Sequence, residues 1–110
     1  MVDPRGVRWV VDVPESRRER IRGLLGTSSL GRGHGMLLER CRSVHTFGMR
    51  FPIDVVLLDR AHRVVAVRRV PPGRVTMPRP GVRHVLECPE GSGLRAGDRL
   101  TIDPDPIEGR

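Results

Sequence analysis

A histidine and an aspartate in the centre of the chain could work together as an acid/base pair. His45 and Asp54 lie on either side of Pro52, where a turn could bring two neighbouring strands side by side. An imidazole activated by a carboxylate is the minimal unit of general acid/base catalysis. No serine or cysteine stands in a Gly-x-Ser-x-Gly elbow, so no residue is assigned as catalytic. A hydrolase that uses His45 and Asp54 is therefore an alternative function, and a protein without catalytic activity is favoured over an enzyme.

Other polar side chains of this region could bind a ligand. Thr46 offers a hydroxyl, and Arg50 offers a planar guanidinium that suits an anion. If residues 44–49 are extended, His45 and Thr46 point to opposite faces, so these side chains cannot all converge. Glu87 is a further carboxylate candidate. The candidate binding residues are His45, Thr46, Arg50, Asp54 and Glu87.

Cysteine and histidine recur in a mirrored arrangement that has the ligand types of a zinc site. Cys41 and His45 are separated by three residues, and so are His84 and Cys88. On a strand, residues at this spacing stand about 13 Å apart, too far to hold one ion without a sharp bend. We therefore expect no metal site and no cofactor, and we expect both thiols to stay reduced.

All 20 cationic side chains are arginines, and the formal net charge is +7. Such a charge could favour an anionic partner, with phosphate contacts from the arginines at 17–22 and from Arg68 and Arg69. However, lysine, asparagine, glutamine and tyrosine are absent, as a GC-rich genome would produce, and few aromatic side chains are present to stack on bases. Specific nucleic-acid binding is not expected. An arginine-based binder of nucleic acid or of an anionic surface is kept as an alternative.

The elements around these residues are predicted from apolar periodicity and from glycine and proline breaks. An amphipathic helix is predicted for residues 15–25, between Pro14 and Gly26. Runs of β-branched and other apolar residues between turn signals predict short strands. The predicted strands are 7–13, 36–38, 44–49, 53–58, 64–70, 74–77, 82–88 and 99–103.

These elements predict a mainly β protein, with α+β character limited to the one N-terminal helix. Short strands separated by frequent turns are typical of a compact antiparallel β barrel or sandwich of the jelly-roll type. A chain of 110 residues has room for a single hydrophobic core. Residues 1–103 are therefore predicted to form one β-rich domain, and residues 104–110 a disordered C-terminal tail.

The segment from His45 to Val56 resembles the centre of the bacterial and archaeal proteins grouped as domain-of-unknown-function family 192. The commoner form there is aromatic-Trp-Met-Lys-Asn-Thr leading into Pro-Leu-Asp, whereas this chain departs from it at 44–49. The resemblance covers residues 7–102 and implies a compact, mostly antiparallel β structure with no agreed activity. Its other matches, in chain order, are Arg22-Gly23-Leu24-Leu25, Gly35-Met36-Leu37-Leu38, Val85-Leu86-Glu87 and Gly97-Asp98.

We therefore expect a small, soluble, cytoplasmic protein of unknown function that acts as a ligand-binding module. No apolar run is long enough for a secretory signal or a membrane span. The expected partner is a small molecule or a peptide, bound on the surface formed by residues 45–54 and 82–87. The sequence makes no prediction of the oligomeric state.

Overall fold

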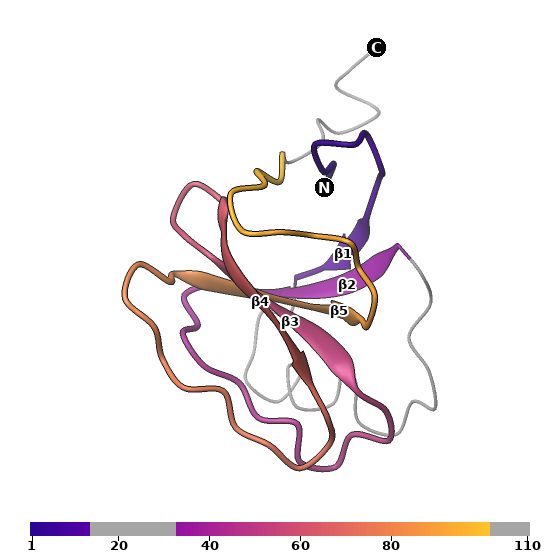
Figure 1. The fold of residues 1–110 in the computed structure, drawn as a ribbon, viewed down its shortest axis with the longest axis vertical. Coiled ribbons are helices and arrows are strands. Elements are labelled where there is room, and N and C mark those ends of the chain that lie inside the picture. The colour runs from indigo at the N-terminus through magenta and orange to yellow at the C-terminus, as the bar shows by residue number, and fades with distance from the viewer. Residues whose placement is uncertain (14–32, 102–110) are drawn as a thin grey trace.

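The fold is a single five-stranded mixed β-sheet (Figure 1). It is seen in a computed structural model, which describes residues 1–13 and 33–101. The order across the sheet is β1-β2-β5-β3-β4. β1 pairs in parallel with β2, and every other neighbouring pair is antiparallel. The strands are β1 (Val10–Asp12), β2 (His34–Leu38), β3 (Ile53–Leu58), β4 (Val64–Val70) and β5 (His84–Pro89).

The prediction of an antiparallel barrel or jelly-roll sandwich was wrong. The described residues form one open sheet, with β1 and β4 at its edges, and the sheet includes the parallel pair β1 and β2. Residues 1–13 and 33–101 contain no helix. The helix predicted for residues 15–25 and the tail predicted for residues 104–110 lie outside the described residues.

Three predicted strands do not join the sheet, which is why no barrel closes. Residues 44–49 and 74–77 share a single bridge, between His45 and Val75, and residues 99–101 make only isolated bridges. Prolines on both sides of 74–77 lack the N–H that a longer ladder needs. The predictions for 53–58 and 64–70 are confirmed, because β3 and β4 have these bounds.

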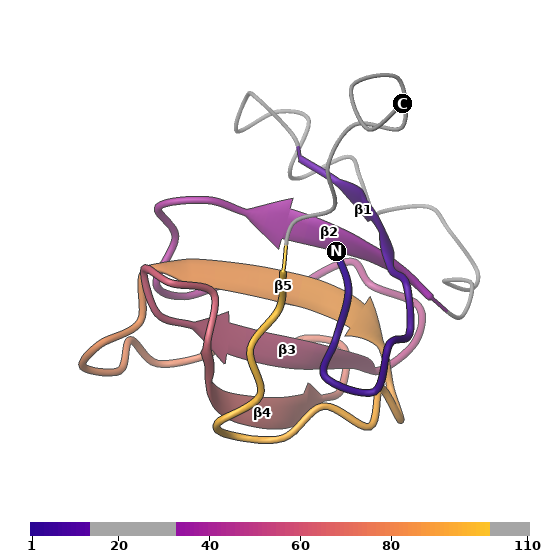
Figure 2. The same ribbon diagram turned by 90° about the horizontal axis from the view of Figure 1, so that it is seen from above.

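One face of the sheet, here called the Trp9 face, is covered by the two ends of the described chain. Trp9 comes from the N-terminal segment, and Leu94 and Leu100 come from the segment after β5. They pack against strand residues such as Val56 and Leu86, which are completely buried. Figures 1 and 2 show both segments on the same side of the strands. These residues form one of the two clusters of the hydrophobic core, which is stabilised by the burial of apolar area.

The opposite face, here called the Val55 face, is covered by the segments that follow β2 and β4. Its buried strand residues include Ile53, Val55 and Val85, and Val82 closes over them. Partly buried side chains of residues 41–51 pack against the same cluster. The sheet therefore has two covered faces, and the segments that contain most of the predicted site residues lie on the Val55 face.

Candidate functional site

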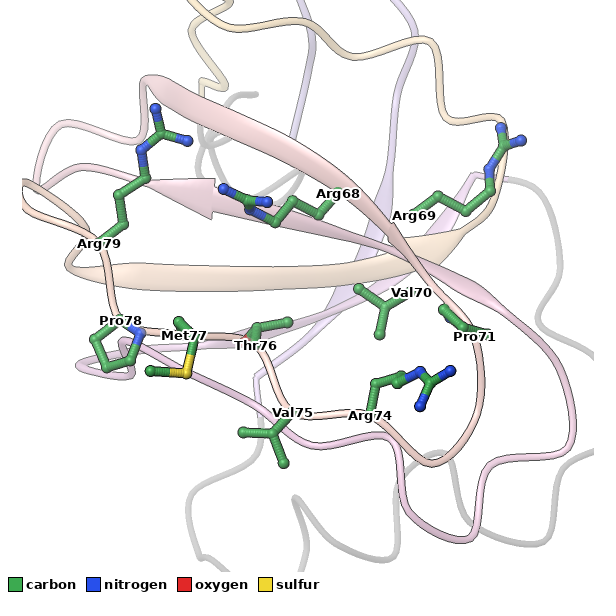
Figure 3. Close-up of a pocket in the computed structure, with 10 residues that line it drawn as sticks. All are labelled: Arg68, Arg69, Val70, Pro71, Arg74, Val75, Thr76, Met77, Pro78 and Arg79. Atoms are coloured by element: carbon green, nitrogen blue, oxygen red, sulfur yellow. The ribbon is translucent and has the colours of Figure 1, made fainter.

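A hollow of about 550 Å³ lies beside the C-terminal end of β4 (Figure 3). One wall is formed by residues 68–71, and the other by residues 74–79 after the turn at Gly73. Gly73 has φ of 79°, a left-handed conformation that glycine adopts without strain. The turn folds the chain back, so that the two walls face one space.

Arginine dominates the charge of the hollow. Four of its lining residues are arginines and none is acidic. Arg69 has acidic partners, because its Nε lies 3.4 Å from Glu90 and 3.9 Å from Asp54. In the described part of the chain, no salt bridge reaches the other three, which are Arg68, Arg74 and Arg79. Figure 3 shows the guanidinium groups of Arg68 and Arg79 in the left part of the view, that of Arg69 at its upper right, and that of Arg74 in its lower right part.

The hollow also has an apolar component. Met77 is 76% exposed and Val75 is 56% exposed, although both are apolar. Beside them, His45 forms the bridge to Val75 and stacks on Phe47, with ring centroids 5.4 Å apart. Phe47 is itself 54% exposed. Apolar side chains therefore lie next to uncompensated positive charge on one surface.

Thr46 fixes the second wall of the hollow. Its side chain is fully buried, and its Oγ1 donates to the carbonyl of Pro71 at 2.7 Å and accepts from the N–H of Arg74 at 2.8 Å. The Thr46 N–H donates to the carbonyl of Arg74 at 2.8 Å. Thr76 makes the matching contact, since its Oγ1 accepts from the N–H of Val44 at 2.9 Å. Thr46 does not itself line the hollow, and it is thus a positioning residue.

The structure does not bring His45 and Asp54 together. Asp54 is directly opposite Cys88 on β5, so its side chain is on the Trp9 face, where Oδ2 accepts from the N–H of Ser92 at 3.0 Å. His45 belongs to the segment that covers the Val55 face. No hydrogen bond between the two is found among the described residues. Arg50, the remaining candidate of this segment, is exposed.

Glu87 lies in the middle of the sheet with its side chain on the Val55 face. It is directly opposite Met36 on β2 and Val55 on β3, and it is 5% exposed. Burial removes water from the carboxylate and raises the pKa of Glu87 to about 7. Arg68 is on the same face, beyond Val55, at two strand spacings or about 10 Å between backbones. No ion pair joins Arg68 and Glu87 in the described structure.

The mirrored cysteines and histidines do not converge. Cys88 is buried on the Trp9 face, where burial and then the charge of Asp54 raise the pKa of its thiol to about 12. Cys41 donates its thiol hydrogen to a backbone carbonyl two residues away. His84 stacks on His62, with ring centroids 5.1 Å apart. Over residues 1–13 and 33–101, no three or more histidine, cysteine or acidic side chains are grouped as metal ligands.

Sequence reasoning missed Arg74, Met77 and Arg79 as site residues. Residues 74–77 were predicted only as a strand, although residues 74–79 combine two arginines with neighbouring prolines. That combination could have indicated a segment outside the sheet, because proline lacks the backbone N–H that a regular strand ladder requires. The convergence of this segment with β4 depends on the Gly73 turn and on Thr46, which no local pattern reveals.

The described residues thus define a small β protein with one open mixed sheet and an arginine-lined hollow beside an edge strand. The chain belongs to DUF192, the family described as Uncharacterized ACR, whose model matches residues 1–102. The resemblance noted in the sequence is therefore confirmed. Within the part of the chain that the structure describes, no helix is long and apolar enough to cross a membrane.

Related sequences carry names that assign no activity. A UPF0127 protein of Thermococcus sibiricus is 30% identical over 93 residues, which cover 79% of this chain and 60% of the relative. A UPF0127 protein of Pyrococcus horikoshii is 41% identical over 49 residues, which cover 44% of this chain and 43% of the relative. The chain therefore matches less than two thirds of the length of either relative.

Two crystal structures share the fold. A protein of unknown function from Novosphingobium aromaticivorans superimposes with a TM-score of 0.73 at 22% identity, over 86% of this chain and 75% of that one. A candidate transcription regulator from Sinorhizobium meliloti gives a TM-score of 0.72 at 24% identity, over 83% of this chain and 79% of that one. At these identities, the likeness shows a common fold alone.

Proposed function

We propose that this chain is a binding module that holds an anionic ligand with an apolar part in the hollow beside β4. The function of its family is unknown, so the proposal depends on the geometry of this chain. The observation that carries it is the group formed by Arg68, Arg74 and Arg79, which line one hollow with no acidic residue among its walls. Such a group attracts negative charge and excludes cations.

The chemistry of the walls suits a carboxylate, sulfonate or phosphate attached to an apolar body. Guanidinium groups bind such oxygens through paired hydrogen bonds. Val75 and Met77 provide apolar area, at about 25 cal/mol per Å² removed from water. A volume of about 550 Å³ is in the usual range for small-ligand sites. His45 and Phe47 lie beside this surface, and we propose them as its rim.

The two alternatives have less support. A hydrolase based on His45 and Asp54 requires the two side chains in one cleft, and they lie on different faces of the sheet. A nucleic-acid binder would need the arginines at 17–22 on the same surface as Arg68, and those residues lie outside the described structure. Binding without catalysis is the function that the described contacts support.

The test is a fluorescence titration with 8-anilinonaphthalene-1-sulfonate, an apolar anion that is nearly dark in water. Arg74→Glu should weaken binding of this dye by about tenfold or more, because it places a negative charge in the wall. Arg60→Glu is the matched control, since Arg60 is exposed in the β3–β4 turn and its change alters the net charge equally. Added salt should weaken binding to the native chain.

Two results would overturn the proposal. One is an equal effect of Arg74→Glu and Arg60→Glu, which would mean that the dye senses only the net charge. The other is dye binding that does not change with salt, which would mean that the arginines take no part. Thermal melts of all three proteins should show one cooperative transition, because a partly unfolded chain also binds this dye.

A further inference from the structure

β4 has an unpaired side. It lies at one edge of the sheet, so only β3 pairs with it as a strand (Figure 2). On its outer side, the backbone of Val64 bonds to Gly97 and Asp98, at 2.8 Å and 2.7 Å. Beyond the β3 ladder, no backbone hydrogen bond joins residues 65–70 to any other described residue. Such an edge is a template for another extended chain.

The arginine-lined hollow borders the C-terminal part of this same edge, at residues 68–70. Successive side chains of a strand point to opposite faces, and Arg68 and Arg69 follow this rule, since they are opposite Val55 and Asp54 on β3. Both nevertheless line the hollow, together with Val70. A space bordered by consecutive residues of one strand lies beside the strand backbone or at the strand end, and not over one face of the sheet alone. The arginines that line the hollow therefore lie next to the unpaired backbone of β4 (Figure 3).

Charge decides what kind of chain can pair there. A second copy of this protein, added through the same edge, would bring Arg68 and Arg69 close to the same residues of the first copy. Like charges across a strand pair are destabilising. An incoming strand with glutamate or aspartate would instead meet Arg68, Arg74 and Arg79, which have no acidic partner in the described structure. Charge thus disfavours pairing of this edge with a second copy of the protein and favours pairing with an acidic segment.

We infer that the partner is an extended acidic segment of another protein, which adds to the sheet as a strand beside residues 65–70 of β4. This inference rests on the proposed anion site and names the class of its ligand. Backbone hydrogen bonds would supply affinity, and the arginines would select acidic side chains, as in other cases of strand addition. Val75 and Met77 would contact the apolar side chains of the added strand.

The test uses a synthetic peptide of alternating glutamate and valine, about seven residues long, the length of a typical strand. A second peptide has the same side chains with all backbone amides N-methylated, so it keeps the charge and loses the donors. The native chain should bind the first at least about tenfold more tightly than the second. Amide hydrogen exchange of residues 65–70 should also slow when the first peptide is bound.

The outcomes separate strand addition from simple anion binding. Equal affinity for the two peptides, with Arg68→Glu still weakening both more than Arg60→Glu does, would overturn strand addition and leave the anion site in place. An Arg68→Glu chain that binds both peptides as well as Arg60→Glu would overturn both proposals. Concentration-dependent dimerisation that protects residues 65–70, or a single-stranded oligonucleotide that displaces the peptide, would assign the edge to another occupant.

Discussion

At the scale of single residues, buried polar groups of this chain serve different ends. Thr46 satisfies its hydroxyl within the protein, with contacts to Pro71 and Arg74, and so fixes a wall of the hollow. Glu87 is also buried, yet no hydrogen bond or ion pair to its carboxylate is found in the described structure. A buried carboxylate without a partner costs stability when it is charged. The first is a structural anchor, and the second is expected to make the stability of the fold depend on pH.

Glu87→Gln should remove a pH dependence from the stability of the fold. The pKa of Glu87 is raised from 4.5 to about 7, so the folded state holds this proton after the unfolded state has released it. The free energy of unfolding therefore falls as the pH rises from 4.5 to about 7. At about pH 8, the variant should be more stable than the native chain by up to ~3 kcal/mol, and at about pH 4 the difference should be small.

Urea unfolding at the two pH values measures this difference. Glu90→Gln is the control, because Glu90 is exposed, so its charge is not buried by folding and only its surface contact with Arg69 is lost. If Glu87→Gln is equally or less stable at the higher pH, the charge of the Glu87 carboxylate is stabilised in solution, and burying it does not lower the free energy of unfolding.

At the scale of elements, β2 and β5 pack closely at Gly35, which has no side chain. Gly35 precedes the register pair of Met36 with Glu87, and the backbone packs closely there. A Cβ on Gly35 would lie 2.9 Å from Cδ1 of Leu86 and 3.2 Å from the carbonyl oxygen of Glu87. The backbone oxygen cannot move without displacing the central strand. A side chain at this position is opposed by the close contact between strands and not by an unusual φ angle.

Gly35→Ala should therefore destabilise the sheet by about 1–3 kcal/mol, as overpacking of a closely packed site does. His34→Ala is the matched control on the same strand, because His34 is exposed and should change stability by less than about 0.5 kcal/mol. Thermal melts of both variants give the comparison. If the two melting temperatures agree, the β2–β5 pair is compliant enough to absorb a methyl group.

At the scale of the whole molecule, the two ends of the described chain close the Trp9 face together. The N–H of Val2 donates to Thr101, and the N–H of Thr101 donates back, at 2.8 Å and 2.9 Å. Asp3, the residue after Val2, is buried and accepts hydrogen bonds from Arg5 at 2.8 Å and from Trp9 at 3.2 Å. Segments almost a full chain length apart therefore share one covering layer, which no local pattern specifies.

Asp3→Asn should weaken this layer, because the amide group presents donors where carboxylate oxygens now accept. Burial acts to raise the pKa of Asp3, but the hydrogen bonds from Arg5, Trp9 and the backbone together lower it. The ionised form thus stabilises the fold above pH 3.8, and this stabilisation is lost as the pH falls through the lowered pKa. At neutral pH, the substitution should cost about 1–3 kcal/mol.

Fluorescence of Trp9, the only tryptophan, can follow this unfolding in urea. Asp3→Asn should lower the urea midpoint at neutral pH, and the gap to the native chain should narrow below pH 3.8. A gap that stays constant across this pH range would mean that the charge of Asp3 contributes nothing and that only its shape is needed.

The sequence by itself determined the features that depend on interactions between residues close together in the chain. The strands at 53–58 and 64–70 were predicted and found, because they are adjacent in the chain and pair as a hairpin. In the turn between them, Asp59 Oδ1 accepts from the N–H groups of Ala61 and Arg63. The family was also evident from the sequence, since short motifs recur in order along the chain.

Only the tertiary structure decided the sheet order and the site. The parallel pairing of β1 with β2, and the place of β5 between β2 and β3, are contacts between distant segments. The side of the sheet that each of His45, Asp54 and Glu87 occupies depends on strand register, because a shift of one residue exchanges the faces. The hollow forms for the same reason: Thr46 ties the segment after Gly73 to its place beside β4, and hydrogen bonds between distant residues leave no periodic signal in the sequence.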